Sequence, residues 1–410
     1  MEIRPILSAL LRNKTGPLLV AMQVALSLAI LANALHIVSE RRAVAARPSG
    51  LLDEASTFYF SVRSLNQDTP EQQLGAIKRE IDVLRAVPGM VAVGKASQMP
   101  LSDNGHMTSV AADPRQERES AHVSTYVTDG SMVKTLGLKL VEGRDFLPHE
   151  IREVNEVDER DLPMLVIVTR ALADKLWPGA PAVGKTLYFG TGSEARGAQV
   201  AGVVERLQTI HAQIGEAGEY SLIIPALEYG HPGRLYAMRS EPGQRDRVMK
   251  EAEAALRNSS ATPMILRIKT SEGDRKDRYR ADMALSWMLV TVSVLLLLVT
   301  CSGIVGMASL WVTQRRKQIG VRRALGARRI DVLRYFIVEN VLITSAGVFG
   351  GVLLGVALNA LLVSKLEMTR LPLAYLLAGA VVFWVIGILA AYGPAWRAAS
   401  TSPALATRST

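Results

Sequence analysis

The chain has 410 residues, of which 49% are hydrophobic and 21% are charged, and its formal net charge is +9. This composition is too apolar for a wholly water-soluble enzyme and indicates that part of the chain lies in lipid. A basic chain can bind nucleic acid or a membrane surface. Here the basic residues lie beside apolar segments, which favours the membrane over nucleic acid. The single cysteine, Cys301, excludes an internal disulfide and a cysteine-based zinc cluster.

Residues 1–15 are predicted to form an amphipathic helix on the inner membrane surface, because five apolar side chains share one helical face: Ile3, Ile6, Leu7, Leu10 and Leu11. Residues 16–39 are the first predicted membrane span. An alternative is a signal peptide, since Ala32-Asn33-Ala34 resembles a cleavage site. The apolar run continues past this site through Leu35 and Ile37, which favours a retained anchor.

Residues 40–282 have the character of a soluble α+β domain, or of two smaller ones. Short β-rich runs at 165–168, 200–204 and 221–224 alternate with helical patterns at 71–87 and 245–257. Polar stretches predict loops at 102–120, 149–161 and 208–219. The carboxylates of 150–161 do not follow the spacing of a calcium loop, so a solvated loop is expected there.

The sequence GAPAVGKT, residues 179–186, matches the phosphate-loop pattern through Gly179, Gly184, Lys185 and Thr186. A true phosphate loop follows a buried strand and opens a helix. Here residues 170–177 read as a helix and residues 186–189 as a strand, so the order is reversed. We therefore predict a structural turn, with Gly184 in a tight backbone conformation, and no nucleotide cofactor.

Catalytic and metal-binding patterns are absent from the sequence. The six histidines follow no H-E-x-x-H or similar ligand spacing, and no G-x-S-x-G elbow occurs. The chain is therefore not expected to be an enzyme or to hold a metal. A membrane-anchored enzyme would require polar groups of residues 40–282 to converge in three dimensions.

Three further spans are predicted at 283–312, 336–364 and 373–393, because each holds the roughly 20 apolar residues that cross a bilayer. Pro394 is expected to end the last helix. The loop 313–335 carries eight cations against one acid, Asp331, and should be cytoplasmic. Alternation then places the N-terminus and the tail 394–410 inside and residues 40–282 outside, although Arg41, Arg42 and Arg47 oppose this orientation.

The loop 313–335 has an apolar strip made of Ile319, Val321, Ala324 and Leu325, and Gly326 is expected to break its helix. Such a helix can transmit force or dock into a partner's groove, or it can bind anionic lipid. The sequence favours neither role.

In the third span Gly347, Gly351 and Gly355 recur every four residues and predict a face that another helix approaches closely, within one protomer or between two. Glu339 and Asn340 are expected at the membrane interface.

Residues 315–342, RRKQIGVRRALGARRIDVLRYFIVENVL, resemble the FtsX-like permease region of MacB-type ABC transporters. TLGLKLVEGRDF, VIVTRALADKLWPGAPAVGKTLYFG and PAWRAASTSPALATR are similar to other parts of that family. The family often has a P-x-G-K turn, which accounts for the phosphate-loop match. Gln318 departs from the family, which often has Glu before Ile-Gly.

The resemblance implies a dimer of four-span permease subunits with a large outer domain and an ATPase that is fused or separate. Because no ATPase domain is recognised here, a separate ATPase subunit is expected. The residues expected to couple to it are Gly320, Arg322, Arg323, Leu325, Gly326, Arg328 and Asp331. The second span, whose helix is expected to begin near Lys276, would carry the motion outward.

The resulting expectation is a permease of the inner (plasma) membrane that transmits ATP-driven motion to its outer domain, for export or extraction of a peptide, antibiotic or lipoprotein. Expected partners are the ATPase, a second permease subunit, membrane lipids and a periplasmic adaptor. The alternative is a transmembrane regulator or sensor that controls a cell-envelope enzyme or a kinase.

Overall fold

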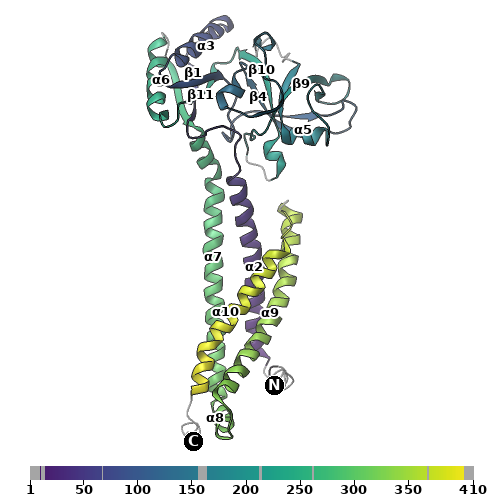
Figure 1. Cartoon of the computed structure of the whole chain (residues 1–410), viewed down its shortest axis with the longest axis vertical. Helices are drawn as coiled ribbons and strands as arrows, with labels where there is room; N and C mark the ends of the chain where they lie inside the picture. The colour runs from purple at the N-terminus through teal and green to yellow at the C-terminus, as the bar shows by residue number, and fades with distance from the viewer. Residues whose placement is uncertain are drawn as a thin grey trace. The chain divides into compact units, whose positions relative to one another are not determined.

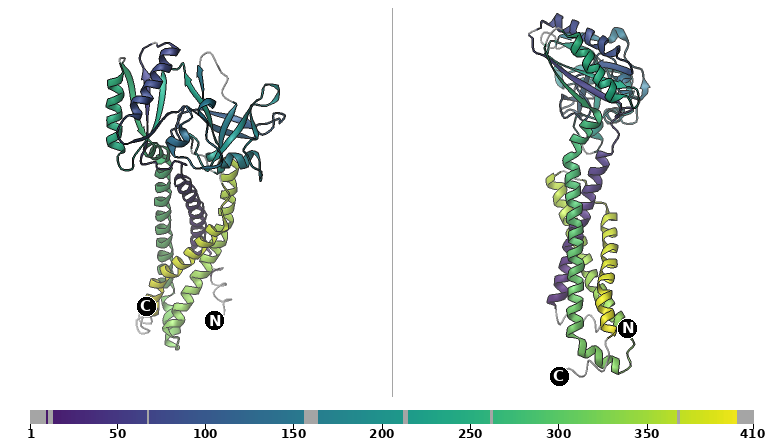
Figure 2. Two further views of the ribbon diagram at one scale, coloured as in Figure 1. Left: turned by 45° about the horizontal axis from the view of Figure 1, so that its top comes forward. Right: turned by 90° about the vertical axis from the view of Figure 1, so that its left-hand side faces the viewer.

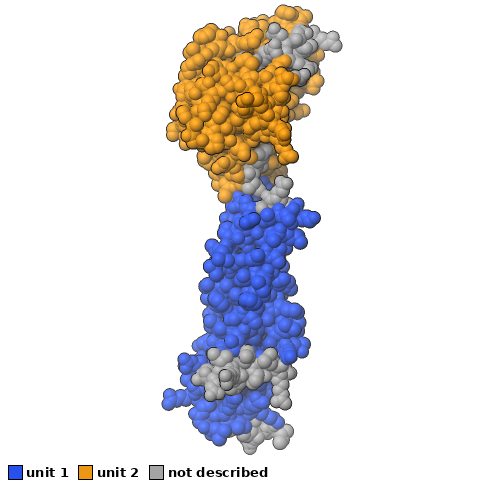
Figure 3. Space-filling model, turned by 90° about the vertical axis from the view of Figure 1, so that its right-hand side faces the viewer, with its two compact units in different colours: residues 1–42, 282–410 blue, residues 43–281 orange. Residues whose placement is uncertain are grey.

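The computed structural model describes residues 10, 14–66, 68–155, 164–211, 215–260, 263–366 and 369–400. The chain forms two compact units (Figures 1 and 3). The helical unit comprises residues 1–42 and 282–410, and the α+β unit comprises residues 43–281. Most of the predicted helix 1–15, most of the acidic run 150–161 and residues 401–410 of the tail lie outside the described residues.

Four helices of the described chain are long and apolar enough to cross a membrane. Their bounds are α2 Thr15–Ala45, α7 Ser271–Gln314, α9 Arg329–Leu366 and α10 Leu373–Ser400. Helix α7 begins five residues before the expected Lys276. The prediction that Pro394 ends the last helix is wrong, because α10 continues through it. Proline removes one N–H from the helix, and packing against neighbouring helices compensates for that loss in membrane proteins.

The glycine row of α9 lies against α2. A Cβ atom at Gly347 would lie 2.7 Å from both the Ala21 carbonyl oxygen and Val24 Cβ, and one at Gly351 would lie 2.9 Å from Leu28 Cβ. A Cβ at Gly355 would meet Leu376 at 3.0 Å and the Ala29 backbone at 3.6 Å. The row therefore permits close packing of helices within one chain.

Gly347→Ala is expected to destabilise the helical unit by about 1–3 kcal/mol, because the added methyl group overlaps the α2 backbone. The measurement is thermal unfolding of the detergent-solubilised protein. Gly306→Ala in α7 is the matched control, since a Cβ there meets nothing within 4 Å. Equal midpoints for the two variants would contradict close packing at Gly347.

One part of the α+β unit is a four-stranded antiparallel sheet with the order β12-β1-β11-β2. Helices α3 and α6 cover one of its faces (Figure 2). Phe58 and Phe60 lie two positions apart on β1, so both side chains point to the face that the helices cover. There they pack in one buried cluster with Ile77 of α3 and Val248 of α6. The elements are β1 Thr57–Ser64, β2 Met90–Lys95, β11 Gly233–Ser240, β12 Met264–Thr270, α3 Pro70–Arg85 and α6 Arg245–Ser259.

The other part is a sheet whose pairing closes into a ring, β4-β3-β8-β9-β7-β10 and back to β4, with β5 added on β9 and β6 on β10. Closure leaves no free edge within the ring. Its strands are β3 Met107–Ala111, β4 Ala121–Thr128, β5 Leu140–Gly143, β6 Arg152–Asn155, β7 Leu165–Thr169, β8 Thr186–Phe189, β9 Arg196–Val204 and β10 Ser221–Tyr229. The short helix α5 Arg170–Leu176 packs against its strands β4, β7 and β9, whereas α4 Met132–Leu136 contacts β2 and β11 of the four-stranded sheet.

Two of the predicted loops contain strands. Strand β3 lies within 102–120 and β6 within 149–161. Both are short and flanked by polar residues, so their strand conformation depends on pairing with β4, β8 and β10. The predicted loop 208–219 ends in a 3-10 turn, Glu216–Glu219.

A buried ion pair joins α3 to β11. Arg234 Nη2 lies 3.1 Å from Glu80 Oε1, and the two side chains are only 5% and 10% exposed. The Tyr236 hydroxyl also donates a hydrogen bond to Glu80. Burial raises the pKa of Glu80, and the Arg234 guanidinium offsets part of that rise.

Arg234→Met is expected to destabilise the protein by about 3–5 kcal/mol at neutral pH, because it leaves the Glu80 carboxylate buried without its cation. A carboxyl whose pKa is raised in the folded state supports folding below its unfolded pKa and loses that contribution as the pH rises. The deficit should therefore shrink as the pH falls and Glu80 becomes protonated.

Thermal unfolding of the Arg234 variant at neutral and acidic pH measures both effects. The control is Arg85→Met, which removes an exposed partner of Asp82 and should cost less than about 1 kcal/mol. A loss for Arg234→Met no larger than that of the control would contradict the expectation.

Candidate functional site

The candidate site is helix α8, Arg316–Ala324, with the start of α9 and the end of α10. Helix α8 ends because Gly326 takes φ = +98°, a conformation that favours glycine. The Arg328 backbone N–H then donates to Asp331 Oδ2 at 3.0 Å, and α9 begins at Arg329. The predicted break at Gly326 thus separates two helices.

The inner face of α8 is attached to the ends of α9 and α10. Ile319 is buried, 8% exposed, in a cluster with Val332, Phe336, Ala395 and Ala399. Arg323 Nη1 donates to the Ala399 carbonyl oxygen at 2.8 Å. Gly320 is also buried.

A polar clasp, made of Arg315, Glu339 and Tyr335, joins the residue before α8 to α9. Arg315 Nη1 lies 3.0 Å from both carboxylate oxygens of Glu339, whose side chain is 1% exposed. The same nitrogen lies 3.3 Å from the Tyr335 hydroxyl. Arg322 lies 5.4 Å from the centre of the Tyr335 ring on its face. Glu339 is therefore paired inside the helical unit, and its position at the membrane interface stays a prediction.

The outer face of α8 consists of Gln318, Val321, Arg322 and Leu325, which follow the i, i+3, i+4, i+7 spacing of one helical face and are all exposed. Val321 is 53% and Leu325 83% exposed. The residues of the predicted apolar strip therefore lie on two different faces of the helix. Ile319 is buried against α9 and α10, whereas Val321 and Leu325 are exposed.

The other predicted coupling residues do not share one surface. Gly320 and Arg323 lie within α8, where Gly320 is buried and Arg323 is partly buried. Gly326, Arg328 and Asp331 lie beyond the end of α8 and are exposed. Arg315 and Tyr335 of the clasp were not predicted from the sequence as site residues. A carboxyl group at the end of an apolar span was the available signal, because a buried charge needs a partner.

The phosphate-loop match lies in the α+β unit, after α5 and before β8. Gly179 and Gly184 have φ of +70° and +83°, and the Gly184 N–H donates to the Val200 carbonyl oxygen at 2.9 Å. Lys185 Nζ lies 5.5 Å from the centre of the Trp177 ring. Thr186 opens a strand, so the turn does not lead into a helix as a phosphate loop does. Among the described residues, no group of three His, Cys, Asp or Glu could hold a metal ion.

Lys185→Ala is expected to leave ATP binding of the whole chain unchanged and to cost at most about 1 kcal/mol of stability, from the lost contact with Trp177. Equilibrium dialysis with labelled ATP measures the binding. Micromolar binding by the native chain that disappears in the variant would reverse the interpretation of this turn.

Comparison with known families agrees with this architecture. The model described as MacB-like periplasmic core domain matches residues 20–272, and the one described as FtsX-like permease C-terminal matches residues 290–403. These matches, with four apolar helices, define a membrane permease. The chain belongs to the MacB/FtsX-like family of ABC transporter permeases, and the predicted fold class is confirmed.

Named relatives match parts of the chain. The macrolide export ATP-binding/permease protein MacB of Bradyrhizobium diazoefficiens is 33% identical over 39% of this chain and 26% of its own length. MacB of Chromobacterium violaceum is 26% identical over 77% of this chain and 48% of its own length. The chain thus spans about half or less of these relatives. The solved periplasmic region of MacB from Actinobacillus actinomycetemcomitans, 12% identical, covers 57% of this chain and 97% of that chain with a TM-score of 0.35.

Proposed function

We propose that this chain is the permease subunit of an ABC transporter and that a separate ATPase subunit docks on the outer face of α8. The exposed apolar pair Val321 and Leu325 carries the proposal, since a soluble partner can bury these side chains while Arg322 and Arg328 meet its acidic groups. Large exposed apolar side chains beside cations are typical of a contact surface.

Motion of the ATPase would reach the α+β unit through the chain itself. The inner face of α8 is fixed to α9 and α10, and the clasp fixes its first residue to α9. Helix α7 runs without interruption from the end of β12 to the residue before Arg315. A displacement of α8 would therefore be transmitted along α7 to β12. This mechanism does not require the substrate to pass through the membrane part of the chain.

The proposed arrangement places both termini and α8 in the cytoplasm and the α+β unit outside the inner membrane, with a second permease subunit and a periplasmic adaptor as further partners. Support comes from the excess of cations in residues 315–334. Because Cys301 is the only cysteine, Cys301→Ser gives a background for single-cysteine labelling. A membrane-impermeant maleimide added to intact cells should label Ser120→Cys and spare Ala327→Cys; the reverse pattern would invert the topology.

We propose that the substrate is a peptide, an antibiotic or a lipoprotein that is handled outside the inner membrane. The names of relatives support this class: one exports macrolides and another, from Pseudomonas syringae, exports pyoverdine. A separate experiment from the ATPase assay tests the substrate. Export of a macrolide and of pyoverdine is measured in cells that lack this chain and in the same cells after the chain is restored.

The deciding experiment is affinity purification of the solubilised chain from its native membrane, followed by an ATP hydrolysis assay. We expect an ABC ATPase to co-purify and its hydrolysis rate to depend on this chain. Recovery of no ATPase, with no hydrolysis in the reconstituted mixture, would refute the proposal. Recovery of an envelope hydrolase or a kinase on the outer side would instead identify a regulator.

A further inference from the structure

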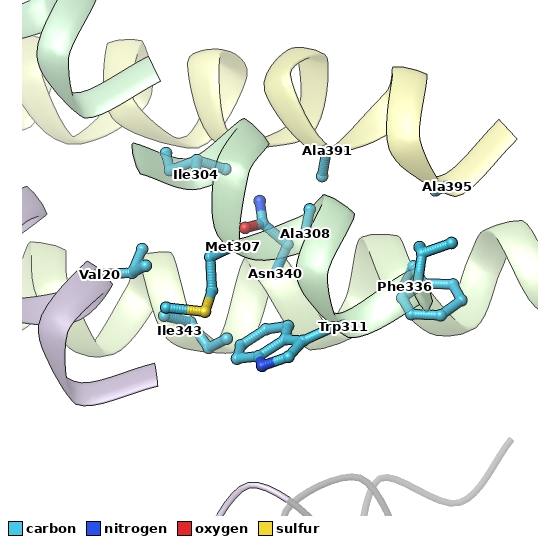
Figure 4. Close-up of a pocket in the computed structure, with 11 residues that line it drawn as sticks. Val20, Ile304, Met307, Ala308, Trp311, Phe336, Asn340, Ile343, Ala391 and Ala395 are labelled. Carbon is cyan, nitrogen blue, oxygen red and sulfur yellow. The ribbon is translucent and has the colours of Figure 1, made fainter. Parts of the chain in front are cut away.

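Helices α2 and α7 contact each other within the helical unit. Figure 4 shows the start of α2 and the end of α7, where Val20 and Met307 line the same narrow cleft. Near the other ends of the two helices, Arg41 of α2 forms an ion pair with Asp282 of α7. The chain therefore passes into the α+β unit from two helices that are already neighbours.

Inside the α+β unit, one side chain of α7 binds the end of α2. Arg275 Nη1 donates to the carbonyl oxygen of Ala45, the last residue of α2, at 2.8 Å, and to that of Arg47 at 3.0 Å. Carbonyl groups at the C-terminus of a helix lack donors within the helix and carry partial negative charge. The guanidinium group supplies both a donor and a positive charge at this point.

The same guanidinium group also binds the connection from α2 to β1. Its Nε and Nη2 atoms lie 2.7 and 2.5 Å from the two carboxylate oxygens of Glu54, so the pair is bidentate. Burial by itself raises the pKa of Glu54, but hydrogen bonds from Arg275 and Ser49 lower it below the usual range. Arg275, Glu54 and the carbonyl groups of Ala45 and Arg47 thus form one charged joint between α2 and α7.

Apolar packing holds the two helices together at the same level of the chain. Tyr279, one helical turn after Arg275, is 4% exposed and packs with Val44 of α2 and with Leu101. Leu101 has φ = +61°, a region that bulky residues avoid, and its N–H donates to the Thr209 carbonyl oxygen at 3.2 Å. Because this packing does not need the guanidinium group, removing Arg275 should loosen the joint without unfolding the α+β unit.

We propose that Arg275 is a positioning residue that holds the end of α2 against the start of α7, so that both helices enter the α+β unit as one body. A displacement of α7 would then act on β12, which precedes it, and also on β1, which follows Glu54 in the chain. These two strands pair with each other. Transmission of ATP-driven motion through the joint rests on the proposed function, whereas the joint itself does not.

The distance between two spin labels tests the joint in the full-length protein in lipid nanodiscs. Cys301→Ser removes the native cysteine, and Ala46→Cys with Lys276→Cys places one label after α2 and one on α7, both at exposed positions. Without nucleotide, we expect one narrow distance between the labels. Arg275→Met should broaden the distance distribution at least about twofold, because the segment after α2 loses its anchor. Arg275→Lys should broaden it less, since lysine keeps the charge but not the planar fork.

Arg245→Met is the matched control for the loss of a half-buried arginine. Arg245 is 23% exposed, against 21% for Arg275. Its Nη1 atom bonds to Glu272 of α7 and to the Ala55 carbonyl oxygen, so it joins α7 to the same connection without binding the end of α2. This variant should lower the unfolding temperature by an amount similar to that of Arg275→Met and leave the distance distribution unchanged.

The measurement is repeated with the partner ATPase trapped by ATP and vanadate. The distance should stay the same in the native chain and shift in Arg275→Met, because only the native chain moves the two helix ends together. Stimulation of the ATPase should be equal in both, since the joint uses no residue of α8.

A distribution in Arg275→Met as narrow as the native one would overturn the proposal, and so would equal broadening in Arg245→Met. A distance that changes with nucleotide in the native chain would also overturn it, because the helix ends would then move apart. Recovery of no ATPase would refute the proposed function alone, and the comparison without nucleotide would still decide whether Arg275 holds the two helices together.

Discussion

Leu325→Asp is expected to abolish stimulation of the partner ATPase while leaving the permease folded. Leu325 is 83% exposed, so its replacement removes little internal packing. A carboxylate in the centre of an apolar contact must be desolvated on docking, and loss of a central contact of this kind costs at least about 2 kcal/mol, or about thirtyfold in affinity. The measurement is the ATP hydrolysis rate as a function of permease concentration.

The control for this variant is Met164→Asp, which places the same charge on an exposed apolar residue of the α+β unit. In detergent, both variants should have the same unfolding temperature as the native protein. Only Leu325→Asp should lose the ability to stimulate the partner ATPase. Native stimulation in Leu325→Asp would exclude the outer face of α8 as the docking surface. Equal loss in both variants would point to a general effect of the added charge.

Arg315→Met is expected to destabilise the helical unit by about 3–5 kcal/mol, because it leaves the fully buried Glu339 carboxylate without its cation. Glu339→Gln should cost less, since the amide keeps a hydrogen-bond acceptor for Arg315. The double variant Arg315→Met with Glu339→Leu should recover much of the stability, because replacing both charges removes the desolvation penalty of the pair.

A double-mutant cycle on thermal unfolding measures this coupling. Arg322→Met is the matched control: it removes an exposed arginine that contacts the same Tyr335 ring and should cost no more than about 1 kcal/mol. Additive losses for Arg315 and Glu339 would show that the clasp contributes no net interaction. If the clasp also transmits motion, the double variant should stay folded but stimulate the ATPase less than the native chain.

The sequence by itself determined the features that depend on local pattern. Apolar runs of spanning length located the four long helices, since hydrocarbon thickness sets a minimum number of helical residues. The order of helix and strand around GAPAVGKT excluded a phosphate loop, because that motif needs a particular local geometry. Gly326 marked the end of α8 because only glycine adopts its conformation without strain.

Only the tertiary structure decided which distant residues meet. Periodicity placed Ile319 and Val321 on one apolar strip, but α9 and α10 cover just one side of α8, and so one residue is buried and the other exposed. The partner of Glu339 lies 24 positions away, across a helix break. Strands β3 and β6 are too short and polar to be recognised before their neighbours are known. Each of these features depends on pairing between separate elements, whereas hydrophobic periodicity reports only on the element in which it occurs.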